Sequence, residues 1–365
     1  MGGLGARVAS SVSTLAPGYF ALVMASGILS VGMELRGHHT LSWALLVVCA
    51  LAYATLGTLT ALRIARFREL VADEFRDPRR GFGFFTFVAG TNVLGVRLGM
   101  EGAHTATAAL LAVAGVGWLV LGYVVPWTAV LGRSERPVVA TANGTWFIWV
   151  VASQSVAVAA ASLEPVVTTG RRELAVLAVV SWSVGAFLYA AAGVIVALRL
   201  MLYPLLPEDL TPPYWVTMGA LAITVLAGAR IVEMADAPMV DVTRGLVAGL
   251  SVGFWAFATW LIPALVAAGW WRHVTHRVPL RYESSLWSIA FPFGMYAVAG
   301  IYLGRADGLP IVGTVGAAWL WVAFALWSAL LVAMLRHLWR TVLRRPAHTP
   351  AGPDRITGGA RGGRR

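Results

Sequence analysis

SLWSIAFPFGMYAVAGIYLG, residues 285–304, is a run of twenty residues without a charged side chain. Such a run is long enough to cross the ~30 Å hydrocarbon core of a bilayer as an α-helix. Its middle nevertheless holds Pro292, which removes a backbone donor, and Gly294, which costs roughly 1 kcal/mol against alanine in a helix interior. The stretch therefore predicts a membrane-spanning helix whose backbone is unusual beside Phe291 and Phe293.

The rest of the chain shares this apolar character. Of its 365 residues, 58% are hydrophobic and 12% are charged, and the mean hydropathy is +0.74. Soluble domains carry about 25% charged residues. The single cysteine, Cys49, excludes an intrachain disulfide and a multi-cysteine metal site. The composition predicts a polytopic membrane protein, and its spans should be helices because every spanning backbone group must be bonded internally.

Ten apolar segments lie between the charged breaks of the sequence. Their approximate ranges are 16–35, 41–63, 82–99, 105–131, 143–162, 173–199, 212–231, 243–271, 284–304 and 311–340. The connections are short, so neighbouring helices should form five antiparallel hairpins within one transmembrane domain, residues 1–345. This is the all-α integral membrane class. Residues 346–365, rich in Pro, Gly and Arg, are expected to form a disordered basic tail.

All 28 basic residues are arginine, and they are distributed unevenly. With ten spans both termini lie on one side of the membrane, and that side receives 21 of the 28 arginines. The positive-inside rule then places both termini in the cytoplasm of a multi-pass plasma (inner) membrane protein. Arginines in short loops follow from topology, and the basic tail should contact anionic lipid rather than nucleic acid.

The odd-numbered spans carry more helix breakers and polar residues than the even ones. In each odd span an aromatic residue is followed seven positions later by a small or polar one, and these aromatics recur every 61–72 residues, which is one hairpin. The pattern predicts a quasi-five-fold arrangement around a central pore. The candidate pore-lining residues are Phe20, Gly27, Phe85, Asn92, Trp146, Ser153, Trp215 and Trp287. The alternative is that such residues only pack helices together, as in any membrane bundle.

No acidic or basic residue lies deep in an odd span. Ion-coupled pumps usually carry intramembrane carboxylates or histidines, so a passive conduit or a weakly coupled carrier is favoured. The predicted outer ends of the odd spans hold Arg36, Arg97, Arg230 and Arg305. Neighbouring acids are Glu34, Glu101, Glu233 and Asp307. The arginines would concentrate anions at a pore mouth, or alternatively snorkel and pair with these acids.

Four stretches of the odd spans resemble a known family. They are LAPGYFALVMASGILSVG (15–32), FFTFVAGTNVLGVRLG (84–99), NGTWFIWVVASQSVAVAAA (143–161) and LWSIAFPFGMYAVAG (286–300). These motifs are similar to the tellurite-resistance/dicarboxylate transporter family, which includes plant slow-type anion channels and fungal malate and sulfite transporters. The resemblance covers about residues 14–342 and is weak in the seventh span.

The resemblance implies ten helices in five hairpins, a pore lined by the odd helices, homotrimers with one pore per subunit, and small inorganic or organic anions as cargo. It also implies a pore-plugging phenylalanine at the position of Phe291, beside a helix kink at Pro292 and Gly294. On the residues alone, packing between helices is the alternative role for Phe291. The chain differs from the plant channels in its Trp-rich odd helices and in having no long regulatory N-terminal domain, so phosphorylation control of the plant kind is in doubt.

Three classes of function are therefore open. The first is an anion channel gated by a phenylalanine, with no catalysis and no cofactor or metal. The alternative is a proton-coupled carrier of C4-dicarboxylates such as malate, or an exporter of sulfite or tellurite-related species. The third is a membrane enzyme. The absence of an in-membrane histidine pair argues against a haem oxidoreductase.

Overall fold

Two concentric layers of helices form this protein, whose computed structural model describes residues 12–132, 136–234 and 238–343. Ten helices in this part of the chain are long and apolar enough to cross a membrane, and the same part contains no β-strand. Their ends lie within a few residues of the predicted spans, so the all-α membrane fold with ten spans is confirmed. The tail predicted for residues 346–365 lies outside the described residues.

The five odd-numbered spans form the inner layer. Each begins with a 3-10 turn and continues as an α-helix whose side chains are mostly buried. The turns are η1 (Pro17–Phe20), η2 (Gly81–Phe84), η5 (Gly144–Trp146), η8 (Pro212–Trp215) and η10 (Ser284–Leu286). The helices that continue them are α2 (Ala21–Leu35), α5 (Phe85–Met100), α7 (Phe147–Leu163), α9 (Val216–Val232) and α11 (Trp287–Ala306).

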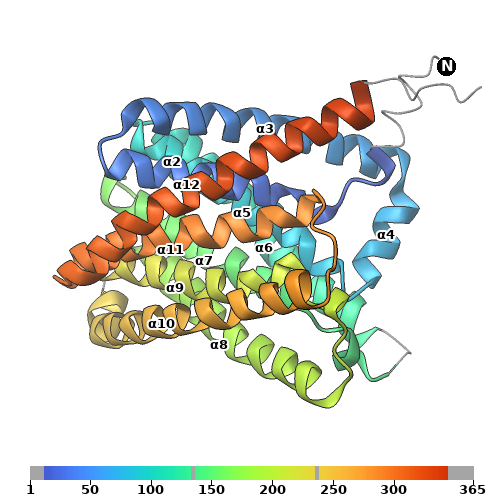
Figure 1. Cartoon of the computed structure of the whole chain (residues 1–365). Helices are drawn as coiled ribbons and strands as arrows, with labels where there is room; N and C mark the ends of the chain where they lie inside the picture. The colour runs from blue at the N-terminus through green and yellow to red at the C-terminus, as the bar shows by residue number, and fades with distance from the viewer. Residues whose placement is uncertain (1–11, 133–135, 235–237, 344–365) are drawn as a thin grey trace, which may run out of the picture.

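The inner helices contact one another in a closed order. α2 packs on α5, α5 on α7, α7 on α9, α9 on α11, and α11 on α2 again. The five 3-10 turns contact one another in the same order. Because an outer helix returns after each of the first four inner helices, all five run in the same direction (Figure 1). We call the end of the ring where they begin the N-terminal mouth and the other end the C-terminal mouth.

The even-numbered spans surround this ring. They are α3 (His39–Arg66), α6 (His104–Val125), α8 (Arg171–Leu202), α10 (Pro238–Trp270) and α12 (Pro310–Leu338). Shorter helices are α4 (Arg68–Arg76) and the segments η3 (Pro126–Leu131), η9 (Trp271–Thr275) and η11 (Trp339–Leu343), which prolong α6, α10 and α12. Each outer helix packs along the inner helix before it and touches the next one. The hairpins are thus joined into a single unit.

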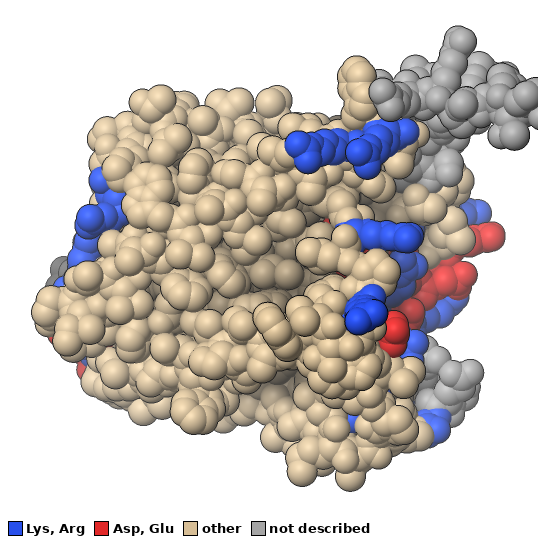
Figure 2. Space-filling model, in the orientation of Figure 1, with Lys and Arg blue, Asp and Glu red and all other residues tan. Residues whose placement is uncertain are grey.

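The outer helices present an apolar surface. Leu51, Phe187 and Trp260 are among many large hydrophobic side chains exposed on them. On the face drawn in Figure 2, the charged residues gather at the two ends of the molecule and an uncharged band lies between them. Such a band matches the hydrocarbon core of a bilayer. The odd spans are thus mostly buried, and the even spans are mostly exposed around them.

Glycines allow the 3-10 turns to approach closely at the N-terminal mouth. Gly144 of η5 faces the backbone of Pro213 and Tyr214 of η8, and a Cβ at this position would overlap the Pro213 carbonyl group. Gly83 of η2 lies against Gly18 of η1 in a similar way. Two of the contacts between neighbouring turns are therefore backbone packed on backbone.

Replacing Gly144 with alanine should destabilise the protein by about 3 kcal/mol, the upper end of the usual cost of overpacking, because backbone cannot yield as a flexible side chain does. The melting temperature of the detergent-solubilised protein measures the effect. Gly193→Ala in α8 is the matched control, since an added Cβ there meets nothing within 4 Å. Equal melting of the two variants would contradict the tight contact between η5 and η8.

The two helix breakers of the ninth span lie where α11 meets its neighbours in the ring. α11 continues through Pro292 and Gly294. A Cβ at Gly219 of α9 would stand 2.8 Å from the Pro292 ring, and a Cβ at Gly294 would stand 2.9 Å from Ile28 of α2. Small residues in membrane helices permit such close approach. These contacts explain the glycines at 219 and 294, while the bend expected at Pro292 stays a prediction.

Candidate functional site

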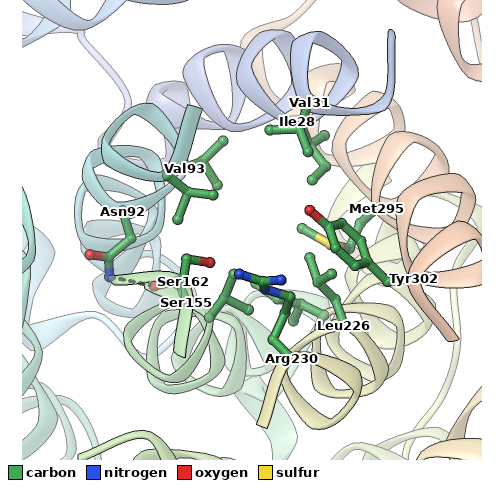
Figure 3. A pocket seen from close by; sticks show the side chains of 13 residues that line it. Ile28, Val31, Asn92, Val93, Ser155, Ser162, Leu226, Arg230, Met295 and Tyr302 are labelled. Carbon is green, nitrogen blue, oxygen red and sulfur yellow. Dashed lines mark hydrogen bonds between the residues drawn. The ribbon is translucent and has the colours of Figure 1, made fainter. Parts of the chain in front are cut away.

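A narrow cavity lies at the centre of the ring, toward the C-terminal mouth (Figure 3). All five inner helices contribute to its wall, and Figure 3 shows them arranged around the opening. The lining residues are Ile28, Val31, Asn92, Val93, Val96, Ser155, Val158, Ser162, Ile223, Leu226, Arg230, Met295 and Tyr302. Because every inner helix lines it, this cavity is the strongest candidate for a functional site.

The polarity and exposure of the cavity wall change along the axis of the ring. At its deep end Asn92 and Met295 are 1% exposed, whereas the side chain of Arg230, toward the C-terminal mouth, is 22% exposed. The wall between them is largely aliphatic, and Arg230 is the one charged side chain among the lining residues. The cavity therefore combines an apolar wall with a single cation near its open end.

Arg230 lies in the last turn of α9, where a positive charge is favoured by the helix dipole. Its Nη1 donates a hydrogen bond to Glu233 Oε2 at 2.9 Å, and its guanidinium carbon lies 5.5 Å from the centroid of the Tyr302 ring. Nε of the same guanidinium is buried and has no hydrogen-bond partner among the described residues. Figure 3 shows the guanidinium and the Ser162 hydroxyl reaching into the opening.

Two polar side chains stand at the deep end. Asn92 of α5 donates from Nδ2 to Ser155 Oγ at 2.9 Å, and Ser155 donates to the Ala152 carbonyl oxygen at 2.7 Å. Within the described part of the chain, Asn92 Oδ1 has no partner. The hydrogen bond joins α5 to α7 and places polar atoms against an otherwise aliphatic wall.

Phe291 lies on the face of α11 that points toward the ring axis. Pro292 faces α9 and Gly294 faces α2, and these are the two ring neighbours of α11. The stripe between those two faces contains Phe291, Met295 and Tyr302, because residues four and seven apart share one side of a helix. Met295 and Tyr302 line the cavity. Phe291 stands one turn nearer the N-terminal mouth, beyond the deep end.

A buried layer continues from Phe291 around the ring. One turn before Ile28, Val93, Ser155 and Ile223, the other inner helices carry the side chains that share this level: Met24, Ala89, Val151 and Gly219. All of them are buried, and Phe291 itself is 1% exposed. Phe291 is the one aromatic residue of this layer, in which Ala89 and Gly219 are small and Met24 and Val151 are larger.

A second, wider cavity of about 400 Å³ lies at the N-terminal mouth. Its wall includes Asn143 and Thr145 before and within η5, Tyr214 of η8 and Ser285 of η10. Charged residues of both signs also line it: Arg79, Arg199, Glu208, Asp209 and Glu283. The two cavities stand at opposite ends of the inner helices, and the layer of Phe291 lies between them.

Most of the pore-lining residues predicted from the sequence lie at helix contacts beside the cavity. Asn92 is the one member of that set that lines it. The others pack against neighbouring helices or turns: Phe20, Gly27, Phe85, Trp146, Ser153, Trp215 and Trp287. In this structure these seven residues therefore make helix contacts, and a pore-lining role for them stays a prediction.

The lining residues follow a different offset from the same aromatics. Ile28, Val93, Ile223 and Met295 each come eight residues after the aromatic of their span. One further residue turns a helix by about 100°, which moves the position from the contact with a neighbour to the axis of the ring. In four of the five inner helices, a lining residue therefore stands one position after the residue that follows the aromatic by seven.

The four arginines predicted for the outer mouth have different surroundings. Arg230 lines the cavity, whereas Arg36 is exposed and Arg305 donates from Nη2 to the Leu35 carbonyl oxygen at 3.0 Å. Arg97 is completely buried between α2, α3 and α5. It donates to Glu101 at 2.6 Å, Glu34 at 3.1 Å, and the hydroxyls of Ser30 and Ser42. Arg97 therefore holds three helices together and does not line the cavity.

Comparison with known proteins fits this architecture. A model of the voltage-dependent anion channel family matches residues 14–335. The chain belongs to this family. The resemblance seen in the odd spans is thereby confirmed, and the protein is a membrane anion channel or transporter at the level that the family defines.

Three individual relatives are similar to different lengths of this chain. An uncharacterized membrane protein of Mycobacterium tuberculosis is 62% identical over 170 residues, which are 46% of this chain and 86% of that protein. Two uncharacterized transporters of Methanocaldococcus jannaschii are 23% identical over 337 and 328 residues. These alignments cover 90% and 88% of this chain and 96% and 92% of the archaeal proteins. The similarity to the transporters thus extends over nearly the whole chain.

Proposed function

We propose that this protein passes small anions across the membrane through the centre of the inner ring, and that Phe291 closes the path. The observation that carries the proposal is the axial cavity, whose lining has one positive charge and no acidic residue. A cation in a low-dielectric cleft raises the local concentration of anions. Transport rather than catalysis follows from the family, and the anion-attracting cavity supports it.

The position of Phe291 supports its role as a gate. It is the aromatic residue of the buried layer, and it stands one turn beyond Met295, at the deep end of the axial cavity. A hydrophobic constriction excludes hydrated ions and loses water readily. With the Phe291 ring buried in this layer, the path would be closed to anions.

The parallel inner helices also favour anions. Their five N-termini meet at the N-terminal mouth, and each helix N-terminus carries a partial positive charge. At the C-terminal mouth the helix dipoles present partial negative charge, which Arg230 offsets from the last turn of α9 at the wall of the cavity. The field of the backbone would thus attract anions at one mouth, and Arg230 would contribute a positive charge at the other.

The N-terminal mouth should face the cytoplasm of a plasma (inner) membrane protein, since the side that holds both termini carries 21 of the 28 arginines. A green fluorescent protein fused after Arg345 should therefore fluoresce, and alkaline phosphatase fused at the same site should be inactive. The opposite pair of results would invert the proposed orientation.

We further propose that the protein forms a homotrimer with one path in each subunit. The resemblance of the odd spans to the tellurite-resistance/dicarboxylate transporter family and the apolar outer helices support an assembly embedded in lipid. Native mass spectrometry of the protein in detergent should give three copies, and a purely monomeric spectrum would contradict the trimer.

The alternative is proton-coupled transport of C4-dicarboxylates such as malate, or export of sulfite or tellurite-related anions. Coupled carriers usually place a titratable relay on the path. Among the residues that line the axial cavity, the titratable side chains are Arg230 and Tyr302. Neither is a carboxylate or a histidine, which favours downhill flow.

Flux into liposomes tests the proposal. Liposomes that contain the protein should take up chloride, nitrate or malate when potassium and valinomycin set the membrane potential, and protein-free liposomes should not. Phe291→Ala is measured in parallel, because a tightly closed wild type passes little anion. No uptake of any of these anions by either protein would overturn the proposed function.

A further inference from the structure

A basic surface lies outside the ring at the N-terminal mouth, where α10 and α12 end and α11 begins. Its exposed arginines are Arg277, Arg281, Arg336 and Arg340. The first two lie in the loop between α10 and α11, and the last two lie at the end of α12 and in η11. The rings of Tyr282 and His337 stand 5.3 Å apart, which brings these two segments together. Figure 2 shows arginines over both segments on one side of the molecule.

The arginines of the basic surface have no acidic partner. Within the described ranges, none of the four side chains makes an ion pair or a hydrogen bond. Other arginines near this mouth differ, since Arg63 pairs with Glu74 and Arg199 pairs with Asp209. The four guanidinium groups are therefore free to bind an anionic group from outside the chain.

A window in the outer layer of helices opens beside the basic surface. α10 and α12 both pack on α11 and scarcely touch each other. Between Trp287 and Ile301, the residues of α11 that are not buried are Ile289 and Phe293, and residues four apart share one face of a helix. The Phe293 ring lies 5.0 Å from the ring of Trp215, which precedes α9, and 5.4 Å from that of Trp319 in α12. The window therefore opens between α12 and the α9–α10 hairpin, and its floor is apolar.

The basic surface lies at the level of a membrane interface. Trp270 at the end of α10 and Trp339 at the start of η11 are both exposed, and tryptophan is enriched at the boundary between lipid and water. The uncharged band of the outer helices begins next to these arginines (Figure 2). The arginines thus stand at the height of lipid headgroups, and the window stands at the height of acyl chains.

An acidic phospholipid matches both parts. Basic clusters next to the end of a membrane helix attract acidic headgroups, and arginine binds phosphate oxygens through parallel N–H donors. A soluble anion would use the arginines and leave the window empty. A zwitterionic lipid would fill the window, but its own cation would offset the charge of its phosphate.

We propose that the basic surface and the window together bind one acidic phospholipid. Arg281, Arg336 and Arg340 hold the headgroup, and an acyl chain lies over Ile289 and Phe293. The site lies on the outer side of the ring, so it depends neither on anion conduction nor on the role of Phe291. It is also separate from the basic tail of residues 346–365, because the residues that form it lie between 277 and 340.

Native mass spectrometry of the delipidated full-length protein tests the site by counting bound lipids. The protein is titrated with dioleoylphosphatidylglycerol and with dioleoylphosphatidylcholine, which have the same acyl chains and differ in net charge. The first phosphatidylglycerol should bind the wild type more tightly than the first phosphatidylcholine. Arg281→Gln combined with Arg336→Gln should lower the affinity for phosphatidylglycerol about tenfold or more, and it should leave the affinity for phosphatidylcholine unchanged.

Arg36→Gln combined with Arg172→Gln is the matched control. These two arginines are exposed at the C-terminal mouth, so this variant loses the same charge from the opposite end of the molecule. It should bind phosphatidylglycerol like the wild type. Equal binding of the two lipids by the wild type, or an equal loss in both double variants, would overturn the site.

Two further measurements distinguish a lipid from other occupants. Glycerol 1-phosphate, a soluble analogue of the headgroup, should not displace bound phosphatidylglycerol when it is added in excess, because it lacks acyl chains. Displacement would show that the basic surface binds soluble phosphate and would refute the lipid site. Loss of an oligomer in the variant with Arg281→Gln and Arg336→Gln, with lipid binding unchanged, would assign this face to a contact between copies of the chain and would also refute the site.

Discussion

Phe291→Ala should raise the anion current more than tenfold over the wild type at matched membrane abundance. The substitution replaces a benzyl group by a methyl group in a buried layer that otherwise contains Met24, Ala89, Val151 and Gly219. The two cavities would then be connected through this layer. A tenfold gain corresponds to lowering the barrier by about 1.4 kcal/mol, and recording from planar bilayers or giant liposomes measures it directly.

Phe293→Ala is the control for this experiment. Phe293 contacts Trp215 and Trp319 on the side of α11 away from the cavity, so its loss should not increase the current. If Phe291 only packs between helices, its replacement would instead leave a cavity, cost roughly 3–5 kcal/mol and lower expression. Equal or smaller current in Phe291→Ala would remove Phe291 as the gate.

Arg97→Gln should cause a large loss of stability, about 3 kcal/mol. Arg97 is completely buried and pairs with two glutamates from two helices. Removal of one partner from a buried ion pair costs about 3–5 kcal/mol, and the lower end applies because the Glu34 and Glu101 side chains are 20% and 28% exposed. The melting temperature in detergent should fall accordingly.

Arg36→Gln is the matched control for Arg97. Arg36 is near the same end of α2 but is exposed, and the described residues include no ion-pair partner for it. Its replacement should leave the melting temperature unchanged. If Arg97→Gln melted like Arg36→Gln, the buried network of α2, α3 and α5 would contribute little to stability.

The fold could be predicted from the sequence to a large extent because a bilayer imposes simple rules. The ninth span, for example, was predicted at 284–304 and is observed at 284–306. Length, hydropathy and charged breaks determine such a segment locally. The closed order of the inner helices depends on contacts between residues far apart in the chain, such as Gly27 with Val93 and Gly219 with Pro292. The aromatic repeat and the family resemblance pointed to a ring, but neither gave these contacts.

The site was less accessible to sequence reasoning. The repeat of an aromatic residue in each odd span was visible in the sequence. The candidates stood seven positions after each aromatic, whereas lining residues stand eight positions after it in four of the five helices. One residue turns a helix by about 100°, so the candidates lie at contacts with neighbouring helices. Asn92 was found because α5 presents both positions to the cavity. Arg230 was one of four arginines predicted at the outer ends of the odd spans. Arg230 lines the cavity and Arg97 is buried among three helices, and this difference depends on how the helices pack. Ser162 and Tyr302 are common residues in apolar runs and gave no signal by themselves.

The reversal potential of the reconstituted protein under independent anion and pH gradients tests passive anion conduction most directly. With unequal chloride on the two sides, the current should reverse at the Nernst potential of chloride, and an imposed pH gradient should not move it. A reversal potential that shifts with the pH gradient would show proton coupling, and a potential that follows the cation gradient would contradict anion conduction altogether.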